Sequence, residues 1–253
     1  MNALAEAFDR AADGYDAGLR ANPVWLLFRH SVQERLRQLF PKGARVLDVG
    51  CGTGEDALLL AEAGVRVFAV DVSPAMVEIA RAKARERNIP SSLLSVEVRT
   101  AEDVAGIDGP FDGAYSNFGA LNCGDLAAVG RGLVRVLKPG APVLLSWMGP
   151  SPLPGVVRHG LRSRRGRNRP HVGGVPLSVR YPTLREVRDL MGQDFVWRDS
   201  FGLGVMLPAP EFPSWPVRHP GLLGVLAGLE SVVRRWPILR GMGDHLAVEG
   251  LRR

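Results

Sequence analysis

Short apolar runs alternate with helix-like stretches along most of this chain. Buried strands are indicated at 46–49, 65–70, 93–98, 111–117 and 142–147. Between them, apolar residues recur at helical spacing over 55–63, 74–87 and 125–136. Strands and helices in this alternation predict an α/β fold with a largely parallel sheet.

Both ends of the chain extend this pattern. An amphipathic helix is predicted over 4–17, and Pro23 opens a second helix whose apolar residues are expected in the core. Beyond residue 148, we expect a helix over 183–191 and two last strands at 195–207 and 245–251. We predict one domain over 1–253, and its parts are an N-terminal helical cap (1–40), a ligand-binding core (41–148), a basic insertion (149–180) and a C-terminal section that completes the sheet (181–253).

The glycine-rich stretch at 48–54 indicates a ligand site. Asp48 is followed by a glycine at every second position, Gly50, Gly52 and Gly54, before a helix begins. Such a loop lets a ligand lie against bare backbone, beside the unpaired N–H groups of a helix N-terminus. The spacing differs from the dinucleotide fingerprint G-x-G-x-x-G, because the third glycine comes one residue early.

The second predicted strand ends in an acid, Asp71, which follows Gly50 by 21 residues. In doubly wound folds an acid at about this interval meets the ribose of a nucleotide. A carboxylate can accept hydrogen bonds from both ribose hydroxyls. Asp71 is not needed as a helix cap, because Ser73 and Pro74 already supply the N-cap and the first helical position.

The D-x-G-x-G-x-G loop and the stretch 70–76 resemble motifs of the class I S-adenosylmethionine (SAM) dependent methyltransferases. The resemblance covers residues 1–147 and implies a seven-stranded, mostly parallel Rossmann-like sheet with helices on both faces. It implies a last strand that is antiparallel and lies between the fifth and the sixth. It also implies an N-terminal helical cap over SAM and a lid inserted after the fifth strand.

The same resemblance implies where SAM binds. Asp71 would bind the ribose, the residues after it would enclose adenine, and Tyr15 would close the pocket from the cap. The family often has an aspartate where this chain has Thr100, so Glu102 or Asp103 would be the acid near adenine, unless each only caps the next turn. No metal is expected. The expected cofactor residues are Tyr15, Asp48, Gly50, Cys51, Gly52, Asp71, Val72, Met76, Ala101, Glu102, Asn117 and Phe118.

The fourth strand leads into Asn117 and Phe118, where the family has its motif IV. This chain lacks the Asn/Asp-Pro-Pro-aromatic signature of amino-directed enzymes that act on DNA, RNA or protein. It also lacks the Pro-Cys nucleophile of cytosine-C5 enzymes. The resemblance implies that Asn117 and Phe118 lie at the methyl end of the SAM pocket, with a turn and a core phenylalanine as the alternative.

Charge is unevenly distributed along the chain. The net charge is +6, but residues 1–150 hold 16 Lys+Arg and 18 Asp+Glu, whereas 151–253 hold 16 Arg and 8 Asp+Glu. The basic half favours an anionic partner, and substrate, nucleic acid and membrane surface all remain open. Two cysteines supply neither a disulfide framework nor a metal site, and no signal peptide is recognised, so a cytoplasmic location is expected.

Six arginines crowd residues 158–169, at the position where the family inserts its lid. Guanidinium groups suit carboxylate or phosphate, so this run either binds an anionic substrate or is a solvated charge run. The catalytic candidates are Tyr15, His171 and Tyr181, each of which could equally be a packing residue. The substrate candidates are Asn117, Trp147, Arg162, Arg165 and His171.

The stretch 208–236 is proline-rich at first and then has a helical pattern of leucines that ends next to two arginines. It either covers an apolar substrate pocket or rests on a membrane as a basic amphipathic element.

The expected reaction moves the methyl group of SAM to an oxygen, nitrogen or carbon nucleophile of a small, partly apolar and possibly anionic molecule, and leaves S-adenosylhomocysteine. Such a reaction depends mainly on orientation and exclusion of water, and needs a base only if the acceptor loses a proton early. Two alternatives remain: an RNA methyltransferase that uses the 158–169 run, and a non-catalytic SAM-binding scaffold at a membrane surface. The oligomeric state is left open.

Overall fold

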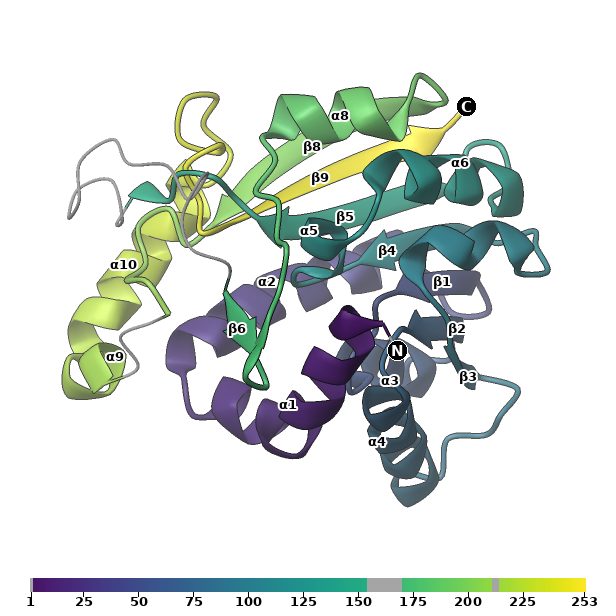
Figure 1. Ribbon diagram of the computed structural model, residues 1–253. Coiled ribbons are helices and arrows are strands. Elements are labelled where there is room, and N and C mark those ends of the chain that lie inside the picture. Colours follow the sequence, from purple (N-terminus) through teal and green to yellow (C-terminus); the bar gives the residue numbers. More distant parts are fainter. Residues whose placement is uncertain (1, 154–169, 211–213) are drawn as a thin grey trace.

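The computed structural model describes residues 2–153, 170–210 and 214–253. A seven-stranded sheet crosses the molecule in the order β3-β2-β1-β4-β5-β9-β8 (Figure 1). The strands are β1 (Arg45–Val49), β2 (Arg66–Asp71), β3 (Leu94–Val98), β4 (Gly113–Ser116), β5 (Pro142–Met148), β8 (Phe195–Leu203) and β9 (His245–Arg252).

The strand directions match the predicted sheet. β1 pairs in parallel with β2 and β4, and the parallel ladder continues to β3 on one side and β5 on the other. β9 is antiparallel to both of its neighbours, β5 and β8. The expected topology, with the last strand inserted between the fifth and the sixth, is confirmed.

Helices cover both faces of the sheet, because the strand residues alternate between two apolar cores. Val46 points into a core shared with α2, α3 and α4, whereas its neighbour Leu47 points into a core shared with α6 and α8. The helices of these layers are α2 (Pro23–Leu39), α3 (Glu55–Glu62), α4 (Pro74–Glu86), α6 (Leu126–Val136) and α8 (Leu184–Met191), and shorter turns are η1 (Ala101–Gly106) and α5 (Ala120–Cys123).

Strand β8 is shorter than the predicted strand 195–207. It ends at Leu203, because the next backbone N–H groups turn toward the carboxylate of Glu230. Gly204 donates to Oε1 of Glu230 at 2.8 Å and Met206 to Oε2 at 2.7 Å. Glu230 belongs to α10 (Pro220–Val233), which follows the short helix α9 (Ser214–Arg218). A carboxylate distant in sequence therefore ends the strand.

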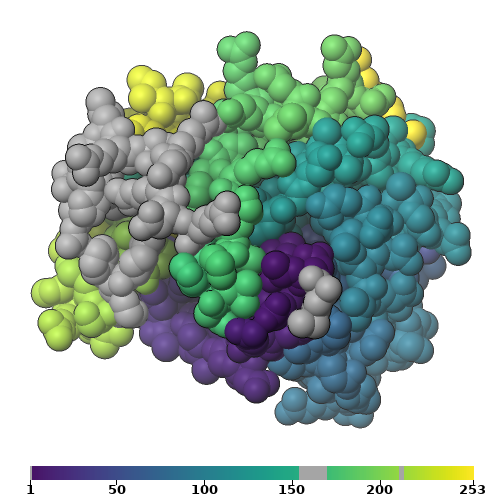
Figure 2. All heavy atoms as spheres, in the orientation of Figure 1, coloured from purple at the N-terminus to yellow at the C-terminus, as the bar shows by residue number. Residues whose placement is uncertain are grey.

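The N-terminal helix α1 (Ala3–Arg20) lies over α4 as a cap. A small hairpin, β6 (His171–Val172) and β7 (Val175–Pro176), packs against the other side of α1. A Cβ at Gly173 would come within 2.4 Å of the carbonyl oxygen of Ala7, so hairpin and helix are in close contact. Figure 2 shows the purple α1 and the green 170–180 segment side by side on one surface.

The residues 154–169, which include the whole arginine run, lie outside the described residues. Within the described parts of the chain, no helix combines the length and the apolar character needed to cross a bilayer.

Candidate functional site

A cavity of about 340 Å³ opens at the carboxyl ends of the parallel strands, beneath α1. Open α/β sheets bind ligands at this edge. All twelve residues predicted to bind the cofactor line the cavity, although they come from five separate segments of the chain. They are Tyr15, Asp48, Gly50, Cys51, Gly52, Asp71, Val72, Met76, Ala101, Glu102, Asn117 and Phe118.

The glycine loop forms the floor of the cavity. Gly50 has a φ of +80°, and a Cβ there would lie 2.2 Å from the Cβ of Ala120. Gly52 also has a positive φ, of +53°, but a Cβ there would meet nothing within 4 Å. The first glycine is required by a close neighbour, whereas the second leaves open space above the backbone, as a bound ligand would need.

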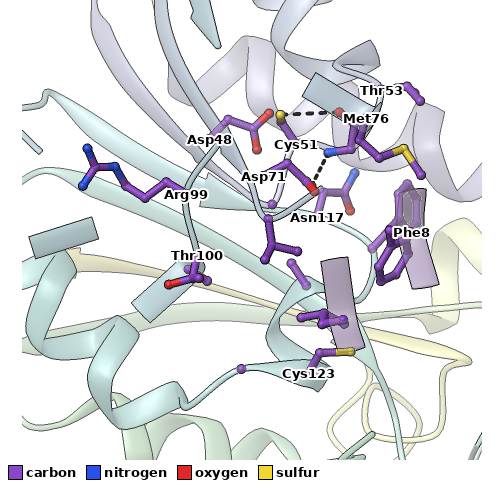
Figure 3. Close-up of a pocket in the computed structure, with 18 of the residues that line it drawn as sticks. Phe8, Asp48, Cys51, Thr53, Asp71, Met76, Arg99, Thr100, Asn117 and Cys123 are labelled. Atoms are coloured by element: carbon purple, nitrogen blue, oxygen red, sulfur yellow. Dashed lines mark hydrogen bonds between the residues drawn. The ribbon is translucent and has the colours of Figure 1, made fainter. Parts of the chain in front are cut away.

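Asp71 lies at the end of β2 with its carboxylate bound to two loop segments, and Figure 3 shows the bond to the glycine loop. Oδ2 accepts the N–H of Gly52 at 2.8 Å, and Oδ1 accepts the N–H of Ser73 at 2.9 Å. Burial raises the pKa of Asp71, and the hydrogen bonds from Ser73 and Gly52 counter part of that shift. Each oxygen keeps further acceptor capacity, so the carboxylate is positioned to bind ligand hydroxyls as well.

Asp48 and Asp56 bring two more acids to the cavity, close to Asp71. Burial raises the pKa of Asp48 well above its usual range, the charge of Asp56 adds to this, and the hydrogen bond from the Tyr115 hydroxyl, at 2.9 Å, opposes it. A cationic ligand would relieve the repulsion among these carboxylates.

Asn117 belongs to a buried polar network at the end of β4. Its side-chain N–H donates to Oδ2 of Asp56 at 2.8 Å, and its side-chain oxygen accepts the hydroxyl of Ser146 at 3.0 Å. Gln33 of α2 donates to the other oxygen of Asp56 at 2.8 Å. The orientation of Asn117 at the cavity wall is thus set by β5, α3 and α2 together.

Phe118 has a φ of +55°, a left-handed conformation that bulky residues rarely adopt. Its ring packs edge-on against Trp25 at 5.8 Å and His245 at 5.4 Å, and the guanidinium of Arg29 lies 5.5 Å from the ring centre. These contacts stabilise the strained turn and place the ring in the cavity wall.

Sequence reasoning missed Arg29 and Asp56, which also line the cavity. Among the described residues no carboxylate forms an ion pair with Arg29, so its charge is available to a ligand. Nothing in the local pattern singles out these two residues, because α2 reads as a core helix and Asp56 as a first-turn acid. The other lining residues not predicted are Asn2, Leu4, Phe8, Thr53, Arg99, Thr100, Ala120, Cys123 and Gly124.

The far end of the cavity lies at η1 and α5. Thr100 and Glu102 both line it, but Oε1 of Glu102 also accepts the N–H of Asp125 at 2.8 Å. Asp103 is exposed and accepts the hydroxyl of Thr100 at 2.7 Å. Burial raises the pKa of Cys123, in the same wall, to about 11, so its thiol is protonated near neutral pH.

Several residues expected at the site do not reach this cavity. Trp147 is fully buried in the opposite core, and its indole N–H donates to the carbonyl of Pro182 at 2.8 Å. His171 is exposed in the β6–β7 hairpin, and Tyr181 is half-buried before α8; neither lines the cavity. Arg162 and Arg165 lie outside the described residues. No described residue of 208–236 lines the cavity either, so α10 does not cover it.

A match to a known protein family decides which kind of domain contains the cavity. Residues 46–140, from β1 to the turn before β5, match the family described as a methyltransferase domain. Over these residues the chain carries a methyltransferase domain. The methyltransferase domain thus spans the glycine loop, Asp71 and the cavity wall at Asn117, and the predicted family resemblance is confirmed.

Curated methyltransferases are similar to this chain over a little more than half of its length. The chain is 34% identical over 146 residues to malonyl-[acyl-carrier protein] O-methyltransferase of Serratia marcescens, which covers 57% of this chain and 52% of the relative. It is 36% identical over 143 residues to ubiquinone biosynthesis O-methyltransferase of Xanthomonas axonopodis pv. citri, covering 56% of each. The chain therefore spans about half the length of the curated relatives it matches.

A solved structure extends the likeness of fold beyond the methyltransferase domain. Geranyl diphosphate C-methyltransferase from Streptomyces coelicolor, in complex with S-adenosylhomocysteine, superposes with a TM-score of 0.60 over 89% of this chain and 81% of that one. At 18% identity this shows a common fold. The predicted Rossmann-like methyltransferase architecture is confirmed.

Proposed function

We propose that this protein transfers the methyl group of SAM to an oxygen, nitrogen or carbon nucleophile of a small, partly apolar molecule. The observation that carries the proposal is the placement of Asp71 and the glycine loop on one cavity within a methyltransferase domain. The cofactor-binding roles of the twelve cavity residues are part of this proposal.

The residues of the cavity fit SAM. Asp71 would bind the ribose, since both of its oxygens retain acceptor capacity, and the bare backbone at Gly52 leaves room for the amino-acid part. Asp48 and Asp56 suit the cationic groups of the cofactor. Arg29 offers a guanidinium that suits its carboxylate.

When bound, SAM supplies an electrophilic methyl group on its sulfonium. The chain's own part is to orient a nucleophile and exclude water, and these effects account for about 7–11 kcal/mol in well-aligned reactions. The α1 cap contributes to the exclusion of water, because Asp9 fastens it to the start of α4. Oδ1 of Asp9 accepts the hydroxyl of Ser73 at 2.6 Å and the N–H of Ala75 at 3.0 Å. These bonds hold the cap over the cavity.

Tyr15 acts in this proposal as a wall and a hydrogen-bond donor. Burial raises its pKa, while the positive charge of Arg29 opposes this shift and the negative charge of Asp71 adds to it. The hydroxyl therefore keeps its proton near neutral pH. A phenol in that state positions a bound group and does not abstract a proton from it.

Oxygen is the favoured acceptor atom, because both of the curated relatives described above are O-methyltransferases. A small-molecule substrate agrees with the absence from 117–122 of the sequence signature of amino-directed nucleic acid enzymes. The cytoplasmic location stays a prediction.

The test combines binding with turnover. Calorimetry should show S-adenosylhomocysteine binding, and labelled SAM should pass its methyl group to at least one member of a panel of phenols, carboxylic acids and amines. Binding without transfer to any acceptor would favour the non-catalytic scaffold, and transfer to RNA alone would favour the RNA alternative. Failure to bind either SAM or its product would overturn the proposal.

A further inference from the structure

The outer face of α10 is apolar and exposed, although the helix is firmly attached to the protein. We define the α10 face as the large apolar side chains between 217 and 238 that are more than two-fifths exposed. They are Val217, Leu222, Val225, Leu229, Val232, Trp236 and Ile238. Elsewhere in the described chain only four large apolar side chains are comparably exposed, and they are dispersed over α2, β3, α8 and β8. The concentration of seven such side chains on and beside one helix requires an explanation.

The helix is oriented by its inner side. Leu223 and Leu226 pack against the core that also contains Phe28 of α2. Glu230, the one charged residue of α10, is buried and accepts N–H groups of Gly204, Val205 and Met206. The single acid of the helix therefore faces the interior, and the exposed residues of α10 are leucine, valine, glycine, serine and the first proline.

The exposed residues form one stripe. Leu222, Val225, Leu229 and Val232 follow each other at intervals of three and four residues, which places them on one side of a helix. Val225 and Val232 are 61% and 60% exposed, and Ile238, just beyond the helix, is 83% exposed. Figure 1 shows α9 and α10 at the margin of the molecule, away from the sheet.

The charges around the stripe are positive. Residues 214–240 contain Arg218, Arg234, Arg235 and Arg240 and no acid except the buried Glu230. Arg218 is exposed beside the N-terminus of α10, and Arg235, which pairs with Asp199 at 2.9 Å, follows its C-terminus. Trp236 is 53% exposed next to it. An apolar stripe with arginines at its ends and a tryptophan beside it complements an anionic lipid surface.

We propose that the α10 face docks this protein on anionic membranes, with the apolar stripe entering the boundary between headgroups and acyl chains. A second copy of the chain fits less well, since the α10 face has seven apolar residues and a standard protein interface uses about 20–30 residues a side. The inference is independent of the proposed methyl transfer. It adds a site of action, which is the membrane surface. The cavity is connected to the α10 face through α2, because α2 packs in the core behind α10 and carries Arg29 of the cavity.

Vesicle flotation tests the docking. The full chain should float with vesicles of phosphatidylcholine and phosphatidylglycerol, less with phosphatidylcholine alone, and less at high salt. The double substitution Val225→Asp with Leu229→Asp should lower vesicle partitioning about tenfold or more. The matched control is Leu190→Asp, an exposed leucine (41%) on α8 that lies outside the α10 face, and this variant should bind like the wild type.

A second measurement keeps the test decisive if the double variant does not fold. Brominated anionic lipid should quench the tryptophan fluorescence of the wild type, and Trp236→Phe should remove most of that quenching while keeping flotation detectable. The proposal is overturned if the wild type stays unbound with every vesicle, or if Val225→Asp with Leu229→Asp floats unchanged. Self-association through α10 without vesicle binding, measured by sedimentation, also overturns it.

Discussion

The hydroxyl of Thr53 donates a hydrogen bond to Oδ1 of Asp16 at 2.6 Å. Thr53 belongs to the glycine loop and Asp16 to the N-terminal helix, so the loop that forms the cavity floor also holds the cap. Lys83 of α4 reinforces this join, because its ammonium contacts both Asp16 and, at 2.6 Å, Glu55 at the start of α3. Cap, loop and two helices are thus linked through one cation.

Replacement of this cation should loosen the cap. Burial raises the pKa of Asp16, but hydrogen bonds from Lys83 and Thr53 outweigh it and lower that pKa below its ordinary value. Lys83→Met leaves two partly buried acids without their shared partner, and we expect a loss of about 2 kcal/mol or more in the free energy of unfolding. In this variant, the exchange of backbone amide hydrogens should become faster in α1 before it becomes faster in α6.

The matched control is Arg85→Met, two residues further along the same helix. Arg85 pairs with Glu78 on the exposed side of α4, where an ion pair contributes little. Thermal unfolding of this variant should resemble that of the wild type. Equal losses in both variants would show that Lys83 does not stabilise the cap specifically.

Asp71→Ala should weaken cofactor binding. Two hydrogen bonds from hydroxyls to a carboxylate are worth about 2–4 kcal/mol together, which corresponds to about 30- to 1,000-fold in Kd. Calorimetry with S-adenosylhomocysteine measures this, and Glu78→Ala, an exposed acid on α4, should leave the Kd unchanged. An unaltered Kd in Asp71→Ala would remove the ribose role.

Arg29→Met should distinguish the two ends of the cofactor. The guanidinium lies at the end of the cavity near Tyr15 and Asp48, so it should pair with the carboxylate of the amino-acid part. We expect Kd for S-adenosylhomocysteine to rise about tenfold or more, because a charge-assisted bond is lost. Methylthioadenosine has no carboxylate and should bind both proteins alike. Equal losses for both ligands would indicate a structural role for Arg29.

The stability of the protein should fall as the pH rises through the titration of Asp48. Because the pKa of Asp48 is well above 3.8 in the folded protein, the folded state keeps a proton that the unfolded chain releases. Above its raised pKa, Asp48 is ionised in both the folded and the unfolded state, and its contribution to the free energy of unfolding is then at its least favourable. Asp48→Asn retains the acceptor for Tyr115, and its unfolding temperature should exceed that of the wild type at neutral pH but match it in acid.

The same titration should affect binding in the opposite direction. A cationic ligand favours the ionised carboxylate, so wild-type affinity for SAM should rise with pH over this range, and the affinity of Asp48→Asn should change less. Parallel pH profiles in the two proteins would contradict the role of Asp48.

The alternation of strands and helices and the glycine loop could be predicted because their signals are local, whereas the place of the last strand followed from the family resemblance. The spacing of Gly50 and Asp71 along the chain needs only one strand and one helix between them to become a shared site. Ser73 caps α4 as its sequence indicates, since its hydroxyl accepts the N–H of Met76 at 3.1 Å.

The substrate side of the site could not be predicted in the same way. Trp147 and Ser146 are adjacent in β5, so they point to opposite faces, and the pattern does not say which one faces the ligand. The structure turns Ser146 toward Asn117 and Trp147 into the core. Arg29 and Asp56 reach the cavity only through the packing of α2 on α3, which no short stretch of sequence encodes.

A crystal structure with S-adenosylhomocysteine tests the central claim most directly. The account predicts both ribose hydroxyls within hydrogen-bonding distance of the Asp71 carboxylate, with the amino-acid part over the backbone at Gly52 and its carboxylate at Arg29. A cavity that stays empty after soaking, or that takes up a nicotinamide or flavin nucleotide instead, would contradict it.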